Sequence, residues 1–345
     1  MINLTTNYMG LTLKSPIIAG SSGFTKSVSD IKKIEANGAG AVVLKSIFEE
    51  QIRYETEKMI NEKSNARIDP MIKGFDEIMK TRSYDYAEAM EYLSSFAKEY
   101  TLDSYLNNIK AIKKEVNIPV IASVNCIFMY DWHSFAKKIQ EAGADALELN
   151  IYILPSDLKR SGGENEKMYF DIIESVKKYV TIPISLKVGY YFSGLGQKLV
   201  ELSNTGISGL VLFNRPFSPD IDLDNFKITP GNILSSPTEY AQTLRWIAIL
   251  NGKLNCDIAA ATGIHNYEAA IKNILAGANA VQVTSAIYKN GFEIISEMLK
   301  GIESWMKKHN FNSIEDFRGK INEYNLDNPA AFERVQFMKL YSKIE

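Results

Sequence analysis

Eight short apolar runs recur along the chain, and the segments between them carry the pattern of amphipathic helices. The runs are Pro16–Ala19, Ala41–Leu44, Val120–Val124, Ala146–Asn150, Ile184–Val188, Gly209–Phe213, Asp257–Ala261 and Ala280–Val283. Short, continuously apolar runs are typical of strands that are buried on both faces of a parallel sheet. Apolar residues at i, i+3, i+4 and i+7 predict helices between the strands, among them Ser29–Asn37, Ser134–Ala142, Glu166–Tyr179 and Glu268–Leu275.

The junctions from helix to strand repeat two short phrases. One places glycine between small residues, as in Ala142–Ala146 and Ala276–Ala280, where glycine supplies a left-handed C-cap to the helix. The other places proline just before a strand, as in Val116–Val120 and Val180–Ile184. Eightfold repetition of one strand–helix unit predicts a closed (β/α)8 barrel, the TIM barrel of the α/β class. An open Rossmann-like sheet is the alternative, but no GxGxxG motif follows any of the runs.

Two stretches fall outside the repeated unit. Residues Phe48–Asp103 form a long insertion after the second strand, rich in charged residues, Tyr and Met. Excursions of this length at the catalytic face of a barrel usually form lids or partner surfaces. Residues Phe311–Glu345 predict a helical C-terminal extension packed outside the barrel. Because no low-complexity linker interrupts the chain, we expect a single domain over residues 1–345, with the insertion 48–103 at its catalytic face.

Composition argues against several classes of function. Lys and Arg number 39 against 41 Asp and Glu, and the basic clusters lie next to Glu, which predicts no nucleic-acid partner. Two cysteines, Cys126 and Cys256, and three scattered histidines show no metal-ligand spacing, so we expect no metal site. No stretch approaches about 18 uncharged apolar residues, and the N-terminus does not read as a signal peptide. We therefore expect a cytoplasmic protein that acts on a small-molecule substrate, with no membrane partner.

Polar side chains stand at the ends of the second to fifth predicted strands, where a barrel binds its ligand. The second run leads into Lys45-Ser46, and Lys187 lies near the end of the fifth. Two cations that face one cavity suggest an anionic or electron-accepting ligand, although lysines at a barrel rim can also simply reach solvent. Asn125 follows the third run and Asn150 ends the fourth. Their amides would suit the edge of a heterocycle such as a flavin, with turn-closing asparagines as the alternative.

Small residues follow the last two predicted strands. The seventh run leads into Thr262-Gly263-Ile264 and the eighth into Thr284-Ser285. In TIM barrels the segments after strands 7 and 8 commonly bind a phosphate through backbone N–H groups. Either motif alone is a weak signal, but their joint occurrence predicts a phosphate site.

Together these strand ends resemble those of the dihydroorotate dehydrogenase family, whose members are FMN-containing (β/α)8 barrels. The resemblance runs in order over nearly the whole chain outside Phe48–Asp103. The motifs that carry it are Met9–Pro16, Gly20–Ser22, Lys45–Ser46, Asn150, Lys187, Thr262–Ile264 and Asp316–Lys320. The resemblance and the strand ends together predict an FMN cofactor, bound by Gly20, Ser21, Lys45, Ser46, Asn125, Asn150, Lys187, Thr262, Gly263, Thr284 and Ser285.

The segment after the fourth strand departs from the family. Its members remove the substrate proton with a Cys or Ser in a sequence such as Asn-Leu-Ser-Cys-Pro-Asn, opposite the flavin. Here the segment reads Asn150–Asp157, and aligned without a gap Ile153 stands at the base position. The second asparagine of that motif is missing, and the insertion carries Tyr84-Asp85-Tyr86 and Tyr92 in place of the Asn-Ser-Met-Gly-type substrate loop. After the sixth strand one amide remains, Asn214, as the expected substrate contact.

Four side chains are near enough in sequence to supply a substitute base. They are Tyr152, Ser156, Asp157 and Cys126. Each has a simpler interpretation, because Tyr152 and Asp157 could be surface residues and a lone cysteine is often a small buried apolar residue. The sequence therefore leaves the catalytic base open.

These observations favour an FMN-dependent oxidoreductase that acts on CH–CH groups and resembles dihydroorotate dehydrogenase, with a different substrate. A small cyclic or unsaturated amide is the expected substrate class. The first alternative is a true dihydroorotate dehydrogenase of pyrimidine biosynthesis with a relocated base. The second is a flavin-binding or electron-transfer module without turnover. The electron acceptor stays open, as does assembly into a homodimer.

Overall fold

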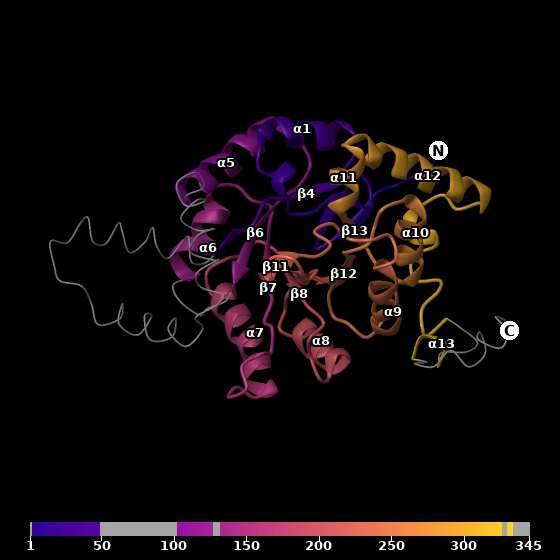
Figure 1. Ribbon diagram of the computed structural model, residues 1–345. Coiled ribbons are helices and arrows are strands. Elements are labelled where there is room, and N and C mark those ends of the chain that lie inside the picture. The colour runs from indigo at the N-terminus through magenta and orange to yellow at the C-terminus, as the bar shows by residue number, and fades with distance from the viewer. Residues whose placement is uncertain (1, 49–101, 127–131, 326–329, 334–345) are drawn as a thin grey trace.

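The strands form a closed ring with helices around it (Figure 1). The computed structural model describes residues 2–48, 102–126, 132–325 and 330–333. Within these ranges the parallel ring consists of β3 (Ile17–Ala19), β4 (Ala41–Val43), β6 (Val120–Cys126), β7 (Ala146–Ile151), β8 (Ile184–Val188), β9 (Gly209–Leu212), β12 (Asp257–Ala260) and β13 (Ala280–Val283). β13 pairs with β3, and β4 with β6, which closes the barrel. The predicted (β/α)8 barrel is confirmed, and each strand lies within two residues of its predicted bounds.

The helices follow the predicted junctions. They are α1 (Val28–Ala36), α5 (Leu102–Glu115), α6 (Trp132–Glu141), α7 (Gly162–Lys177), α8 (Leu195–Ser203), α9 (Tyr240–Leu250), α10 (Tyr267–Ala276), α11 (Ser285–Asn290) and α12 (Glu293–Lys308). Ser161 and Glu164 form a capping box at the start of α7. Gly277 ends α10 with φ of 128°, and Gly143 follows α6 with φ of 96°, so the predicted glycine caps are confirmed. None of the helices in the described ranges is long and apolar enough to cross a membrane.

An N-terminal hairpin fills one end of the barrel. β1 (Thr6–Tyr8) and β2 (Leu11–Leu13) pair antiparallel, and the sequence pattern missed them because polar residues interrupt both strands, so neither is a continuous apolar run. The hairpin buries Tyr8 and Met9 against Gly209 of β9. It completes an apolar cluster inside the barrel that includes Ile18, Ala41, Val43, Ile121, Ala146, Val211, Ala259 and Ala280. The inward-facing polar residues Ser123, Glu148, Ser185 and Gln282 lie above this cluster, toward the C-terminal ends of the strands.

The excursions from the barrel are only partly described. Of the predicted insertion 48–103, Phe48 belongs to β5 (Ile47–Phe48), which pairs with β6, and Leu102 and Asp103 begin α5. The tyrosines expected to replace the substrate loop lie outside the described residues. A second antiparallel hairpin, β10 (Pro219–Asp222) with β11 (Lys227–Pro230), follows β9 and was not predicted.

The C-terminal extension is helical only in short pieces over its described part. It contains a 3-10 turn, η2 (Ile314–Asp316), and a four-residue helix, α13 (Ala330–Glu333). Asn3 bridges to Ser313 and thereby joins the start of the chain to this extension. The expectation of one domain over the whole chain stays a prediction.

Candidate active site

A cavity of about 400 Å³ opens at the C-terminal ends of the strands. Its walls come from the segments after β3, β8, β9, β12 and β13 and from the stretch around residues 230–235. The predicted site residues among its lining are Ser21, Lys187, Asn214, Thr262, Gly263, Thr284 and Ser285. Residues chosen as separate strand ends therefore surround one volume, as expected for the ligand site of a barrel.

A row of cation and amide side chains lies beside this cavity. Asn125, Asn150 and Lys187 are aligned on the neighbouring strands β6, β7 and β8. The side-chain amide of Asn214 donates to Oδ1 of Asn150 at 2.9 Å. Predicted polar residues from four segments are thus brought together at one end of the site, where they can pair with donors and acceptors of a planar heterocycle.

The cationic end of the site continues into the barrel interior. Nζ of Lys187 donates to Oε1 of Gln282 at 3.0 Å, and Nε2 of Gln282 donates to Oε2 of Glu148 at 2.6 Å. Glu148 and Gln282 are 1% and 4% exposed. Neither was predicted as a site residue. A Glu or Gln inside an otherwise apolar strand could have indicated them, because such residues are seldom fully buried without a partner.

Serines join the first three strand ends. Oγ of Ser46 lies 3.1 Å from Oγ of Ser21 and 2.8 Å from Oγ of Ser123, and the backbone N–H of Ser46 donates to Ser21. Lys45 is half-buried beside this network, and burial, with a smaller contribution from the charge of Lys26, lowers its pKa. Ser46 and Lys45 stand next to the cavity rather than in its lining.

The predicted phosphate turn has a backbone that requires glycine. Thr262 and Gly263 have φ of 73° and 77°, and a Cβ on Gly263 would overlap the backbone nitrogen of Tyr240. Oγ1 of Thr262 donates to the carbonyl of Phe213 at 2.9 Å, which ties this turn to the end of β9. After the neighbouring strands β3 and β13, a Cβ on Gly20 would lie 2.5 Å from Oγ1 of Thr284. The two glycines thus let neighbouring segments pack closely, and this end of the cavity is lined by backbone and by the hydroxyls of Thr262, Thr284 and Ser285.

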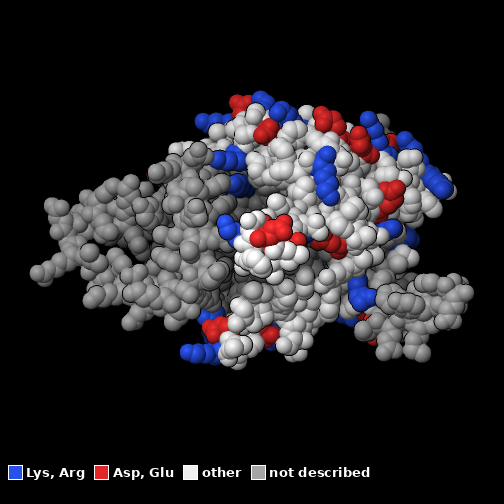
Figure 2. Space-filling model, viewed as in Figure 1, with Lys and Arg blue, Asp and Glu red and all other residues white. Residues whose placement is uncertain are grey.

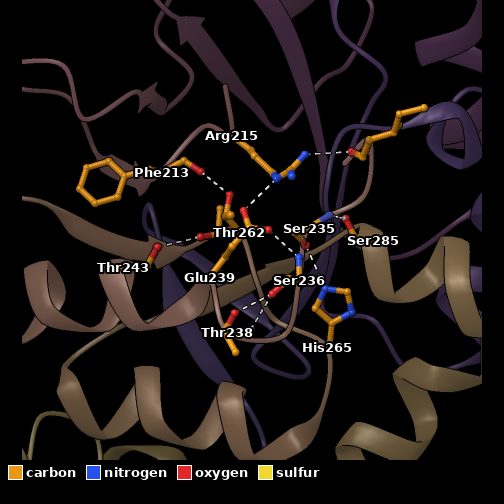
Figure 3. Close-up of polar contacts among 12 residues, drawn as sticks. Phe213, Arg215, Ser235, Ser236, Thr238, Glu239, Thr243, Thr262, His265 and Ser285 are labelled. Carbon is orange, nitrogen blue, oxygen red and sulfur yellow. Dashed lines mark hydrogen bonds and ion pairs between the residues drawn. The ribbon is translucent and has the colours of Figure 1, made fainter. Parts of the chain in front are cut away.

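Ser235 connects the walls of the cavity near Ser285, and its three polar groups all bind other segments. Figure 3 shows its contacts with Ser285 and His265. Its N–H donates to Oγ of Ser285 at 3.0 Å, and its hydroxyl lies 2.9 Å from Nε2 of His265. Nζ of Lys289 donates to its carbonyl at 2.9 Å. Burial, together with the charge of Lys289, lowers the pKa of His265, which favours a neutral imidazole. Sequence reasoning did not single out Ser235 or His265.

An ion pair holds the same stretch from its outer side (Figure 3). Nε of Arg215 donates to Oε2 of Glu239 at 2.8 Å, and its Nη1 donates to the carbonyl of Ile233 at 3.0 Å. Burial would raise the pKa of Glu239, but the N–H of Ser236 and the guanidinium of Arg215 outweigh it and hold that pKa below its ordinary value. A second cavity of about 370 Å³ lies next to this pair and shares the wall Phe213–Pro216 with the first.

Three of the four candidate bases, Tyr152, Ser156 and Asp157, are absent from the lining of both cavities. Tyr152 packs its ring on Gly189, and burial raises its pKa well above the ordinary value, so it is a poor base near neutral pH. Ser156 and Asp157 are exposed, and Asp157 accepts only a local hydrogen bond, from the N–H of Lys159 at 2.9 Å, among the contacts resolved for it. Cys126 ends β6, and its side chain lies outside the described part of the structure.

Ile153, the residue at the expected base position, belongs to the apolar packing. Its side chain is partly buried against the main hydrophobic cluster. Its backbone N–H donates to the hydroxyl of Tyr169 at 3.3 Å. Among the described residues that line the larger cavity, Lys187 and Arg215 are the titratable side chains, and no carboxylate, histidine or thiol lies there.

The described residues contain no cluster of His, Cys, Asp or Glu that could hold a metal ion. Over the face that Figure 2 shows, basic and acidic side chains are interspersed, with no stripe of one sign. A cavity with a lysine and amides at one end and hydroxyls with a glycine turn at the other instead fits an elongated organic cofactor that ends in an anion.

The sequence is similar to known proteins over the part of the chain that forms the barrel. The family model described as dihydroorotate dehydrogenase matches residues 3–306. A Thermoplasma volcanium protein named dihydroorotate dehydrogenase B (NAD(+)), catalytic subunit, is 26% identical over 92% of this chain and 98% of its own length. The protein of the same name from Methanocaldococcus jannaschii is 25% identical over 93% and 98%. A putative dihydroorotate dehydrogenase A (fumarate) from Aeropyrum pernix is 25% identical over 92% and 96%.

Proposed function

The chain belongs to the dihydroorotate dehydrogenase family of flavin-dependent oxidoreductases that act on CH–CH groups, and we propose that its flavin is FMN and that its substrate differs from dihydroorotate. We assign the substrate to the small cyclic or unsaturated amides. The observation that carries this assignment is the packing of Ile153 into the apolar cluster, at the position where the resemblance implies a catalytic Cys or Ser.

The cavity supports FMN through the chemistry of its two ends. Lys187 and the amide of Asn150, which accepts a hydrogen bond from the predicted substrate contact Asn214, suit the electron-accepting edge of an isoalloxazine ring. Ser285 and the turn at Gly263 suit a single phosphate. When bound, FMN supplies the hydride acceptor, and the residues named here bind and orient it and hold positive charge beside it.

A flavin-loading experiment tests this cofactor assignment. The purified protein, stripped of bound cofactor, is titrated with FMN, FAD and riboflavin while absorbance and fluorescence are recorded. FMN should bind with a stoichiometry of one and more tightly than riboflavin, because riboflavin lacks the phosphate, and more tightly than FAD. Tighter binding of FAD, or no flavin binding, would contradict the assignment.

Aromatic side chains support a substrate other than dihydroorotate. The ring centroids of Tyr190 and Phe213 lie 6.0 Å apart in an edge-to-face arrangement, and those of Tyr190 and Tyr191 lie 4.9 Å apart. Tyr152 continues the group at 5.9 Å from Tyr191. Tyr152 and Phe213 follow β7 and β9, where the resemblance implies amides that read the pyrimidine, and Tyr190 and Tyr191 follow β8 between them. An apolar, aromatic wall favours a less polar ring substrate.

A spectral titration tests the substrate class. FMN-loaded protein is titrated with orotate, uracil and less polar unsaturated lactams, and the change in flavin absorbance gives each dissociation constant. We expect at least one lactam to bind more tightly than orotate, because the amide-reading residues of the family are replaced here. Tightest binding of orotate would instead support the second candidate function.

That second candidate is a true dihydroorotate dehydrogenase with a relocated base. The names of the relatives favour it, and so does the position of Cys126, which lies next to Ile151 in the register of β6 and β7. A thiol at this strand end would be the first replacement to test. Substitution of Cys126 by Ala would then abolish reduction of the flavin by dihydroorotate.

A further inference from the structure

Polar side chains form two layers inside the barrel at the end nearest the cavity. The upper layer contains Asn125, Asn150 and Lys187, and two residues earlier on the same strands lie Ser123, Glu148 and Ser185. Because inward positions alternate along a strand, the lower layer faces the same interior as the upper one. The carboxylate of Glu148 therefore lies in the layer beneath Lys187, between it and the apolar cluster around Tyr8.

Gln282 joins these two charges in a fixed orientation. Its Nε2 donates to Glu148 at 2.6 Å and its Oε1 accepts from Lys187 at 3.0 Å. An amide offers a donor on one side and an acceptor on the other, so a carboxylate below forces the oxygen toward the ammonium above. Gln282 also lines the cavity, beside Lys187. The hydrogen bonds from Glu148 through Gln282 thus hold the Lys187 ammonium at the cavity wall.

Burying the charged and polar side chains of this hydrogen-bonded row costs too much stability to be incidental. Glu148 is 1% exposed, and its second oxygen, Oε1, has no hydrogen-bond partner in the described structure. A buried carboxylate that is not fully satisfied costs stability, and stability alone would favour an apolar residue here. Burial, and next the charge of Glu148, raise the pKa of Tyr8 well above its ordinary value, so Tyr8 does not compete as an anion.

The structure assigns Glu148 and Gln282 the role of positioning residues, which fix the ammonium of Lys187 and set the reduction potential of the bound flavin. This inference rests on the proposed flavin and goes beyond it. Reduction adds electrons to the flavin, so the positive charge of Lys187 favours the reduced form and the negative charge of Glu148 opposes it. The two charges therefore act on the potential with opposite signs.

Redox titration of the FMN-loaded protein against a reference dye tests the charge of Glu148. The substitution Glu148→Gln keeps the shape and removes the charge, so it should raise the potential. We expect the ratio of reduced to oxidised flavin at a fixed potential to rise on the order of tenfold, which is about 30 mV for a two-electron couple. Ser185→Ala is the matched control, because Ser185 lies beside Glu148 in the same layer and carries no charge.

A double-mutant cycle tests the role of Gln282 independently. Lys187→Met should lower the potential by a similar factor in the wild type, on the order of tenfold. In a Gln282→Leu background the ammonium loses its oriented acceptor, so the effect of Lys187→Met should shrink to less than about threefold. A merely structural role for Gln282 would change stability in every variant but leave the lysine effect on the potential unaltered.

The outcomes separate this inference from the proposed function. A wild type that binds no flavin overturns both. A flavin-loaded protein whose potential is unchanged or lowered by Glu148→Gln overturns the inference alone, as does a lysine effect of equal size with and without Gln282. A shift in Ser185→Ala as large as that in Glu148→Gln would show that loosened packing, rather than charge, moves the potential.

Discussion

Two parts of the site differ in how they are held together: the cavity walls that follow β9, β12 and β13, and the segment after β7. In the walls, side chains from distant parts of the chain bind one another, as Ser235 does with Ser285 and His265. In the segment after β7, residues 154–159 are exposed and the N–H of Ser156 bonds only to the nearby carbonyl of Leu154. The walls are therefore held together by contacts between distant parts of the chain, whereas the exposed stretch after β7 is held by local contacts.

The largest effect is expected from Gly263, at the centre of the ordered wall. Gly263→Ala places a Cβ against the backbone of Tyr240 at a positive φ, so the turn or the start of α9 must move. We expect FMN affinity to fall on the order of 100-fold, since the cost exceeds that of the positive φ alone, about 1–2 kcal/mol. Equilibrium titration with FMN gives the change.

Gly162→Ala is the matched control in the other region. Gly162 begins α7, soon after the exposed segment, and a Cβ there meets no atom within 4 Å. Its FMN affinity should equal that of the wild type. Equal losses of affinity in the two variants would show that the walls are no more rigid than the segment after β7.

A smaller loss is expected when Ser235 is shortened. Ser235→Ala removes the hydroxyl that pairs with Nε2 of His265, which is 9% exposed, and leaves that nitrogen without its partner. The free energy of unfolding should fall by about 1–3 kcal/mol. Urea denaturation of the flavin-free protein measures this, and a change below about 0.5 kcal/mol would contradict the role of Ser235 in joining the walls.

The ion pair of Arg215 and Glu239 predicts a pH-dependent contribution. The pKa of Glu239 is lowered in the folded chain, so its carboxylate stabilises the protein above its unfolded pKa, and this stability is lost as pH falls through the folded value. Because the pair is partly exposed, Glu239→Gln should cost only about 0.5–1 kcal/mol at pH 7. Denaturation curves at pH 7 and pH 3 should show the gap between the two proteins closing at the lower pH. A gap that persists at pH 3 would mean that packing, rather than charge, accounts for it.

The smallest effect is expected in the segment after β7. Ser156 is exposed, and its side chain makes no hydrogen bond among those resolved. Ser156→Ala should change the free energy of unfolding by less than about 0.5 kcal/mol and leave FMN affinity unchanged. A large loss in either quantity would place Ser156 in the site and remove the contrast between the two regions.

Local sequence patterns were sufficient for the barrel and for the strand-end residues. A buried strand is a run of neighbouring apolar residues, and the residue that follows it must lie at the rim, so Asn150 and Lys187 could be placed from the sequence. Gln282 and Glu148 could not be paired in this way, because 134 residues separate them. Ser235 likewise follows an unpredicted hairpin, and its partners come from two other segments. Such contacts depend on the tertiary structure and leave no periodic signal.

Anaerobic stopped-flow reduction of the bound flavin by saturating dihydroorotate tests the divergent substrate most directly. The wild type and Ile153→Cys are compared, with dithionite as the control that both flavins can be reduced. Loss of a general base costs about 10²–10⁴ in rate, and missing amide contacts add to that loss. Both proteins should therefore be reduced very slowly, because one thiol cannot restore the amide contacts. Fast reduction of the wild type would contradict the account and establish a relocated base, with Cys126 and Ser156 the first residues to substitute.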